Sequence, residues 1–395
     1  MPAGTVMTST VKASTVKTGT VKTGTVTTGT VNAAKGTADT AAPPTPSDLA
    51  ERLWTAVIGR DEPAAMALAT AAADAGADGE TLLLDVVAAV QRRVGHEWAA
   101  NRIGVAEEHA ATAIIDRVVT VLAHRPTPPP SRTRGNVTVA CVDGEWHSLP
   151  ARLLAETLTG RGWRVDFLGA HTPTPHLIAH VHQSNPAAAL LSASLPTHLP
   201  TAHQAVTAVQ SLGIPVMVGG AAFGTDGRYA RLLGADAWAP DARGAADRLA
   251  RGITARHAER RHEIDDLPHL ADQEYTFVKS NRTTLVRRCL AALDERGPDT
   301  RAYSAAQRER TAEDLAHIVD FLATALYVDE ADLFTSFIGW TRDILTARNV
   351  PAAGLRLGLD ILTEQLRDFP RALGFIRVAI DTLPTAPAHS GPGTA

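Results

Sequence analysis

One histidine stands in a short loop between a predicted β-strand and a predicted helix. Residues 137–142 are mostly apolar, and the loop after them, residues 143–150, reads DGEWHSLP with His147 near its centre. In a parallel sheet, ligands bind in the loops at the carboxyl ends of the strands. Imidazole commonly ligates transition metals, and a carboxylate such as Glu145 or Asp143 can fix its tautomer. We therefore expect His147 to ligate a metal. A solvated or structural histidine is the alternative for such a position.

Two further loops carry residues suited to holding a ligand at the same edge of the sheet. The third predicted strand ends in Ser192 and Ser194, which offer hydroxyl groups, and the fourth ends in Gly219 and Gly220. Adjacent glycines let a bulky planar ligand approach the backbone closely. We expect these hydroxyls, the glycines and His147 to converge on one crevice.

The strands that position these loops alternate with helices. Near-continuous apolar strands separated by helices indicate a parallel sheet covered on both faces. Residues 131–254 are therefore expected to form a Rossmann-like (flavodoxin-like) α/β domain. The predicted strands cover residues 137–142, 164–168, 188–194, 215–219 and 236–239.

Helical patterns flank this domain on both sides. Four helices predict a four-helix bundle in residues 47–125, capped at its start by Ser47 and Asp48 and followed by a stiff linker at Pro126–Pro130. Its third helix is expected at residues 79–98. Six more helices predict a compact, all-α domain of about the size of a globin in residues 255–384. They are expected at residues 255–263, 275–295, 304–327, 329–348, 352–366 and 370–383.

Composition and the two ends of the chain limit the class of protein. The chain has 395 residues, a formal net charge of −4 and two cysteines, so we expect no direct nucleic-acid binding, disulfide framework or zinc site. Residues 1–46 repeat Thr-Val-Lys-Thr-Gly and are expected to be disordered, as are residues 385–395. With no signal peptide and no apolar run of about eighteen residues, we expect a cytoplasmic protein without membrane contact.

The loop that holds His147 resembles that of the cobalamin-binding domain found in corrinoid methyl carriers and adenosylcobalamin photoreceptors. In that family the loop reads Asp or Glu, any residue, His, two residues, Gly; Glu145 and His147 match, and Pro150 replaces the glycine. The resemblance implies that His147 is the axial cobalt ligand and displaces the cofactor's own benzimidazole base, whose nucleotide tail reaches the serine and glycine loops. The residues that it assigns to cobalamin binding are Glu145, Trp146, His147, Ser148, Leu149, Ser192, Ser194, Leu195, Gly219, Gly220 and Phe223.

The helical bundle resembles the cap of light-sensing adenosylcobalamin proteins of the CarH type. There a tryptophan covers the upper face of the corrin and a Glu-His pair begins the next helix, which implies these roles for Trp98, Glu108 and His109. A tryptophan of the bundle core is the alternative. In that type a histidine follows the tryptophan and captures cobalt after photolysis. Ala99 stands at this position here, with His96 and His109 as candidate substitutes, and no helix-turn-helix module precedes the bundle.

Residues 315–340 resemble the globin-like sensory domains of bacterial stress-signalling proteins. The order of cobalamin cap, cobalamin domain and globin-like helices resembles the photocobilins, which are photoreceptors that hold a cobalamin beside a biliverdin. The side chain of Cys289 could form a thioether link to the bilin, and the alternative is an inert buried cysteine. Solvated arginines and core aromatics are the alternative for the other bilin residues. The residues that the resemblance assigns to biliverdin are Arg287, His317, Tyr327 and Trp340.

Together these features predict a non-enzymatic light sensor that uses adenosylcobalamin and biliverdin. Loss of the adenosyl group in light is expected to change the packing around Trp98 and thereby the assembly of a light-dependent homo-oligomer, with a downstream signalling protein as a further partner. The alternative is a corrinoid methyl carrier of a methyltransferase system, which shares His147 and the tail loops. A third interpretation is a cobalamin-sensing scaffold whose C-terminal domain holds no bilin.

Overall fold

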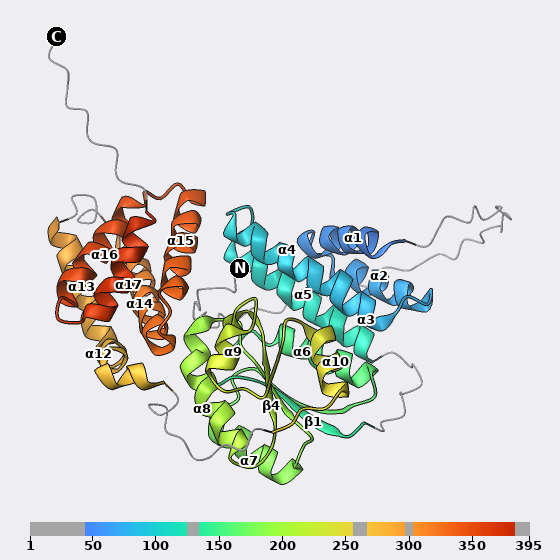
Figure 1. Ribbon diagram of the computed structural model, residues 1–395. Helices are drawn as coiled ribbons and strands as arrows, with labels where there is room; N and C mark the ends of the chain where they lie inside the picture. Colours follow the sequence, from blue (N-terminus) through green and yellow to red (C-terminus); the bar gives the residue numbers. More distant parts are fainter. Residues whose placement is uncertain (1–43, 125–133, 256–266, 297–302, 384–395) are drawn as a thin grey trace, which may run out of the picture.

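The computed structural model describes residues 44–124, 134–255, 267–296, 303–383 (Figure 1). The expectations for the N-terminal repeat, the linker at Pro126–Pro130, the helix at residues 255–263 and the tail 385–395 lie outside these residues, except that residues 44–46 and 255 are described. Within the described ranges, no helix is both long enough and apolar enough to cross a membrane.

The N-terminal helices form a cap with its own apolar core. Helix α1 has Thr45 as its N-cap: the Thr45 hydroxyl accepts the Asp48 N–H, and the Asp48 carboxylate accepts the Thr45 N–H. The expectation that Ser47 caps this helix is therefore wrong, because Pro46 already occupies its first turn. The elements of the cap are α1 (Pro46–Ile58), α2 (Glu62–Asp74), α3 (Gly79–Thr81), η1 (Leu82–Val87), α4 (Ala88–Ala99) and α5 (Val105–Ala123).

The third helix expected in the cap is not α-helical throughout. Residues Leu82–Val87 form a π-helical segment, η1, between α3 and α4, and four of its apolar side chains are buried. π-helical turns arise where the regular α-helical hydrogen-bond ladder is interrupted. The apolar spacing predicted a helix here but carried no signal for the wider turn.

The central domain is a five-stranded parallel sheet in the order β2-β1-β3-β4-β5. Because β2 and β3 lie on opposite sides of β1, the direction of the strand order reverses between β1 and β3, and ligands of such sheets bind outside the carboxyl ends of the strands at that point. The strands are β1 (Asn136–Cys141), β2 (Arg164–Gly169), β3 (Ala189–Ser192), β4 (Val216–Gly219) and β5 (Ala237–Ala239). The helices are α6 (Leu149–Gly160), α7 (Thr174–Ser184), η2 (Pro196–His198), α8 (Leu199–Gln210), η3 (Ala221–Phe223), α9 (Arg228–Leu232) and α10 (Ala242–Ala250).

The C-terminal region is all-helical, as expected. One predicted helix, residues 275–295, is divided at Asn281, whose side-chain amide donates to the carbonyl oxygen of Phe277. Such local bonds compete with helix continuation. The elements are η4 (Pro268–Asp272), α12 (Glu274–Ser280), α13 (Arg282–Arg296), α14 (Ala305–Val328), α15 (Ala331–Ala347), α16 (Ala353–Gln365) and α17 (Pro370–Asp381).

The C-terminal helices share one apolar core with the central domain. Buried side chains of α8, such as Val206, belong to the same continuous cluster as Leu322 of α14 and Ile376 of α17. The cap has a separate cluster, which includes only Leu149 and Leu153 from the central domain. Figure 1 shows the cap above the sheet, and the C-terminal helices beside both.

Candidate functional site

His147 lies in the loop after β1 and its ring is held by Glu145. The ring Nδ1 lies 2.5 Å from Glu145 Oε1, and the same oxygen accepts the backbone N–H of His147 at 2.8 Å. A carboxylate on Nδ1 favours the tautomer with hydrogen on that nitrogen and makes Nε2 the nitrogen suited to a metal. The expected pairing of His147 with a carboxylate is thus present, and Glu145 rather than Asp143 provides it.

Glu145 connects the two loops that flank the switch point of the sheet. Its side chain is fully buried, at 0% exposure, and its second oxygen accepts the backbone N–H groups of Ser194 at 2.6 Å and Leu195 at 3.3 Å. Burial alone would raise the pKa of Glu145, but the hydrogen bonds and charge of His147 and the N–H of Ser194 lower it to about 2. The carboxylate is therefore ionised at neutral pH.

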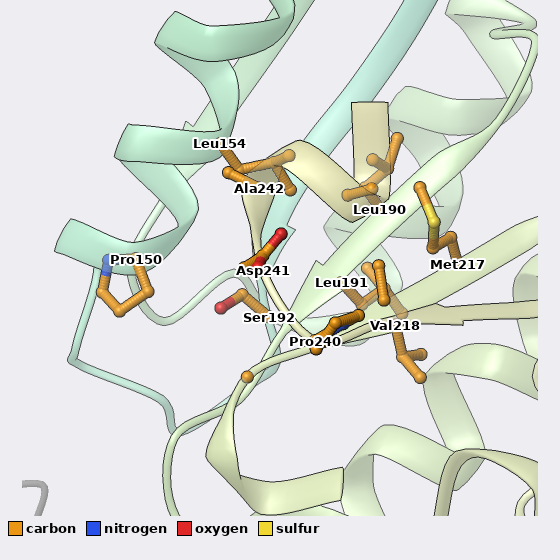
Figure 2. Close-up of a pocket in the computed structure, with 14 residues that line it drawn as sticks. Pro150, Leu154, Leu190, Leu191, Ser192, Met217, Val218, Pro240, Asp241 and Ala242 are labelled. Carbon is orange, nitrogen blue, oxygen red and sulfur yellow. The ribbon is translucent and has the colours of Figure 1, made fainter. Parts of the chain in front are cut away.

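A cavity of about 120 Å³ lies at the carboxyl ends of β3 and β4, next to the first turns of α6 and α10, and Pro150 at the end of the His147 loop is one of the residues that line it (Figure 2). Ser192, Gly219 and Gly220 line it, whereas Ser194 and His147, which we expected in the same crevice, are not among its lining residues. Its other walls are apolar, apart from Asp241 at the start of α10. The cavity therefore offers a narrow apolar slot with a few polar groups at the carboxyl edge of the sheet, which is typical of a ligand site.

Pro150 and Gly220 have local structural roles in the walls of this cavity. Pro150 occupies the first turn of α6, where proline is favourable because its missing N–H has no helical partner. Gly220 has φ +101°, and a Cβ atom there would lie 2.3 Å from the carbonyl oxygen of Ala193. A close approach of Gly220 to the protein's own backbone thus requires a glycine, whether or not a ligand is bound.

The remaining residues expected on this domain lie in three different surroundings. Trp146 is 63% exposed, and its ring stacks on His171. Leu149 packs into the core of the cap, whereas Phe223 is fully buried in the core shared with the C-terminal helices. Ser194 and Leu195 contact Glu145 through their backbones. The structure therefore places Phe223 away from the cavity wall, because its side chain is used in the core.

On the cap, Trp98 and Glu108 are both buried. Trp98 ends α4 with 5% exposure, and its ring centroid lies 6.4 Å from that of Trp340 in α15. Glu108 lies 2.7 Å from Nδ1 of the more exposed His109 and accepts the hydroxyl of Thr112 at 3.0 Å. The expected tryptophan and Glu-His pair thus belong to adjacent ends of α4 and α5, and Trp98 also contacts the C-terminal helices.

The four residues expected to bind a bilin lie in different surroundings. Arg287 is exposed on α13, and Trp340 lies against Trp98. Tyr327 is 0% exposed, and its hydroxyl lies 2.8 Å from Nδ1 of His203 in α8. Burial lowers the pKa of the partly buried His317. Tyr327 and Trp340 therefore join the C-terminal helices to the rest of the chain.

The two cysteines are buried thiols. Burial raises the pKa of Cys289 to about 11 and that of Cys141 to about 12. Both are therefore protonated at neutral pH, and Cys289 also accepts a contact from the side chain of Gln365. Across the described residues, no three His, Cys, Asp or Glu side chains are arranged to hold a metal ion. A single ligand such as His147 suits a metal that arrives inside a larger cofactor.

Two family comparisons cover the cap and the central domain. Residues 135–250 match the family described as the B12 binding domain, and residues 49–123 match a second family of the same description. These segments are a cobalamin-binding domain and its helical cap. The donor set fits that cofactor, since the ionised Glu145 holds the His147 ring by Nδ1 and leaves Nε2 for a metal. No curated protein matches the chain.

Solved structures that are similar to this chain cover about half of it. The monomethylamine corrinoid protein of Methanosarcina barkeri is 19% identical with a TM-score of 0.46, covering 51% of this chain and 97% of that one. The methanol:cobalamin methyltransferase complex MtaBC of Methanosarcina barkeri is 19% identical, with a TM-score of 0.29 and coverage of 52% and 78%. A cobalamin-binding protein from Desulfitobacterium hafniense DCB-2 is 20% identical, with a TM-score of 0.29 and coverage of 52% and 98%.

Three residues that contact the candidate site residues were not predicted from the sequence. His171 contacts the loop of His147 from the β2–α7 connection, and His198 Nε2 lies 4.0 Å from Glu145 Oε2. Arg348 lies over the Trp98 ring, 5.2 Å from its centroid. Each comes from a segment distant in sequence from the residue it contacts, so no local spacing signalled it.

Proposed function

We propose that His147 is the lower axial ligand of the cobalt in a bound cobalamin. The observation that carries this is the contact of 2.5 Å between Glu145 and His147 Nδ1, which presents Nε2 as the ligating atom at the switch point of the sheet. The cavity lined by Ser192, Gly219 and Gly220 would hold the nucleotide tail. When bound, the cofactor would supply a reactive cobalt–carbon bond, His147 would ligate the cobalt, and the cap would cover the cofactor.

We further propose that the chain is a non-enzymatic light sensor that binds adenosylcobalamin, with biliverdin among the C-terminal helices. The supporting observation is that Trp98, the cap residue assigned to the upper face, also contacts Trp340 and Arg348 of the C-terminal region. A change in the packing of Trp98 on loss of the adenosyl group would therefore alter its contacts with α15. Reshaping of that surface would alter the assembly of a homo-oligomer and its contact with a signalling partner.

The second candidate is a corrinoid methyl carrier, which uses the same lower ligand and tail cavity. The comparisons agree with the carrier better than with the light sensor, since two of the three solved structures above are named as a monomethylamine corrinoid protein and a methanol:cobalamin methyltransferase complex. A carrier must present the upper face of its cofactor to partner enzymes. The contact of the cap with α15 favours the sensor, because it ties Trp98 to this chain's own C-terminal helices.

Absorption spectra of the full chain distinguish the two candidates. The chain is loaded in the dark with adenosylcobalamin or methylcobalamin, expressed with and without a supply of biliverdin, and then illuminated. A light sensor should lose the adenosyl group with a change in elution volume and show a red-absorbing band after biliverdin supply. Retention of oligomeric state on illumination, together with methyl transfer to an added thiol acceptor, would favour the carrier. Light-dependent assembly without the red band would leave a cobalamin sensor whose C-terminal helices hold no bilin.

The ligand assignment is tested separately with His147→Ala. The variant should lose the histidine-ligated cobalt spectrum and retain less cofactor on gel filtration. His176→Ala, which removes an exposed histidine from α7, serves as the control and should behave as the original chain. An unchanged spectrum in His147→Ala would mean that the benzimidazole base stays bound and that His147 does not ligate cobalt.

A further inference from the structure

The loop that carries His147 is contacted by a second loop, which joins β2 to α7. His171 of that second loop contacts the three residues that precede His147. Its backbone N–H donates to the carbonyl oxygen of Glu145 at 2.8 Å, and its Nδ1 accepts the backbone N–H of Gly144 at 3.0 Å. Its ring stacks on Trp146, with centroids 4.6 Å apart and planes 12° apart. The backbone and ring of His171 together therefore hold all three residues that precede His147 in the loop.

The backbone of His171 points to a role for its ring. His171 has φ +46°, in the left-handed region that glycine adopts without strain and that side chains with a Cβ disfavour. Glycine would therefore be the residue with the least backbone strain at this position. The histidine is explained by the contacts that only its ring makes, to the Gly144 N–H and to Trp146, and residues in such conformations occur often at functional sites.

Gly144 shows how tightly the loop is confined. It has φ +86°, and a Cβ atom on it would lie 3.3 Å from the ring of His198. Gly144 therefore has little room for a side chain beside His198, and its N–H is bonded to His171. Because Nδ1 of His171 accepts the N–H of Gly144, the ring hydrogen of His171 lies on Nε2. The Asp143 carboxylate, 3.5 Å from Nδ1, therefore makes no hydrogen bond with that nitrogen.

We propose that His171 is a positioning residue for the cobalt ligand. It holds Gly144, Glu145 and Trp146 so that the Glu145 carboxylate stays aligned with His147 Nδ1, while the N–H groups after β3 fix the other oxygen of Glu145. This inference rests on the proposed role of His147. Loss of the His171 contacts should let the loop move and lower the fraction of cobalt ligated by histidine, with an effect at the lower end of the ten- to hundredfold range of outer ligand partners, about tenfold in cofactor loss.

The test uses the full chain labelled with 15N-histidine and loaded with hydroxocobalamin that is then reduced to cob(II)alamin. Electron paramagnetic resonance distinguishes a 15N histidine ligand, which gives doublet splitting, from the unlabelled benzimidazole nitrogen, which gives triplets. His171→Gly permits the backbone conformation and removes the ring. It should lower the doublet fraction at equal bound cobalamin and speed cofactor loss about tenfold.

Two further variants serve as rescue and control. His171→Asn tolerates the left-handed backbone and offers a side-chain oxygen to the Gly144 N–H but loses the stacking on Trp146, so its doublet fraction should lie between those of the original chain and His171→Gly. Asn185→Gly changes another left-handed residue, at the end of α7, and should alter neither readout. Equal doublet fractions and loss rates in the original chain and both His171 variants would overturn the proposal. If His171→Gly does not fold, His171→Asn decides by the same criterion. Absence of the doublet from the original chain would instead refute ligation by His147.

Discussion

The cap and the C-terminal helices both rest on the cobalamin-binding domain, but through different kinds of contact. Between the cap and that domain, Glu80 accepts hydrogen bonds from Arg161, the C-cap residue of α6, and from Arg243 of α10, and Arg243 also binds Asp85. Arg152 of α6 binds the cap as well, through Asp116 and Thr120 of α5. Most of these charged groups are partly exposed to solvent. Apart from the apolar side chains that α6 contributes to the core of the cap, the contacts between the cap and the central domain are therefore mainly ion pairs.

The contact with the C-terminal helices is apolar and buried. Tyr327 packs against His203 and Tyr275 with its ring fully buried, and the two regions share one continuous core. Exposed ion pairs contribute little and are readily solvated, whereas buried apolar contacts resist separation. We infer that the C-terminal helices and the central domain form one body against which the cap can move. Because Trp98 lies against Trp340, such a movement would change the contact of the cap with α15.

Tyr327→Ala tests whether the C-terminal contact is part of a common core. Truncating this buried ring should lower the free energy of unfolding by roughly 3–5 kcal/mol, and should speed hydrogen exchange in α8 as well as α14. Tyr327→Phe removes only the hydroxyl group bonded to His203 and should cost about 1 kcal/mol. Urea unfolding and exchange measurements check both. Normal protection of α8 in Tyr327→Ala would show that the two regions unfold separately.

Asp314 of α14 provides a pH-dependent test in the C-terminal helices. Burial and the neighbouring Glu313 raise its pKa to about 6, and Arg348 opposes that rise only in part. Because the folded pKa exceeds the ordinary value of 3.8, the stability contributed at low pH is lost as pH rises from about 4 to 6. Asp314→Asn should therefore raise the free energy of unfolding at pH 7 by about 1–3 kcal/mol and have little effect below pH 4. Exposed Glu309→Gln is the control, and a similar gain at both pH values in Asp314→Asn would refute the assignment.

Local periodicity predicted most of this architecture. The helix expected at residues 304–327 is α14, Ala305–Val328, and the five expected strands are all present in one parallel sheet. Such features depend on the spacing of apolar residues along the chain. The π-helical turn of η1 and the division at Asn281 depend instead on single backbone interactions, which leave the apolar spacing unchanged.

The same distinction applies to the cobalamin site. Glu145 and His147 lie two residues apart in one loop, so their pairing was predictable from the sequence. The roles of His171 and Arg348 depend on how distant segments pack, and nothing in the residues around them indicated a contact with Trp146 or Trp98. Helical spacing also could not show that the hydroxyl of Tyr327 contacts His203 of the central domain.

Glu80→Gln tests the charged half of the comparison. The substitution weakens the bonds to Arg161 and Arg243 and should destabilise the attachment of the cap by about 1 kcal/mol, seen as several-fold faster exchange in η1 and α4. The difference should shrink in 1 M salt, where charges are screened within about 3 Å. Glu364→Gln, which breaks an exposed pair with Arg296 inside the C-terminal region, should leave the cap unchanged. Equal cap exchange in all three proteins at low salt would show that ion pairs do not hold the cap.

The smallest expected effect concerns Arg348 and Trp98, where the cap meets the C-terminal helices. The guanidinium lies 5.2 Å from the Trp98 ring centroid, a geometry that contributes about 0.5–1 kcal/mol, so a double-mutant cycle of Arg348→Met and Trp98→Leu should give a coupling energy of that size. Arg93 and Trp54 form a matched pair within the cap, at 4.1 Å. Both cycles should show coupling in the free energy of unfolding, but only Arg348→Met should reduce the change in α15 exchange on adding adenosylcobalamin. Coupling at Arg348 without that reduction would mean that the contact stabilises the chain and carries no signal from the cap.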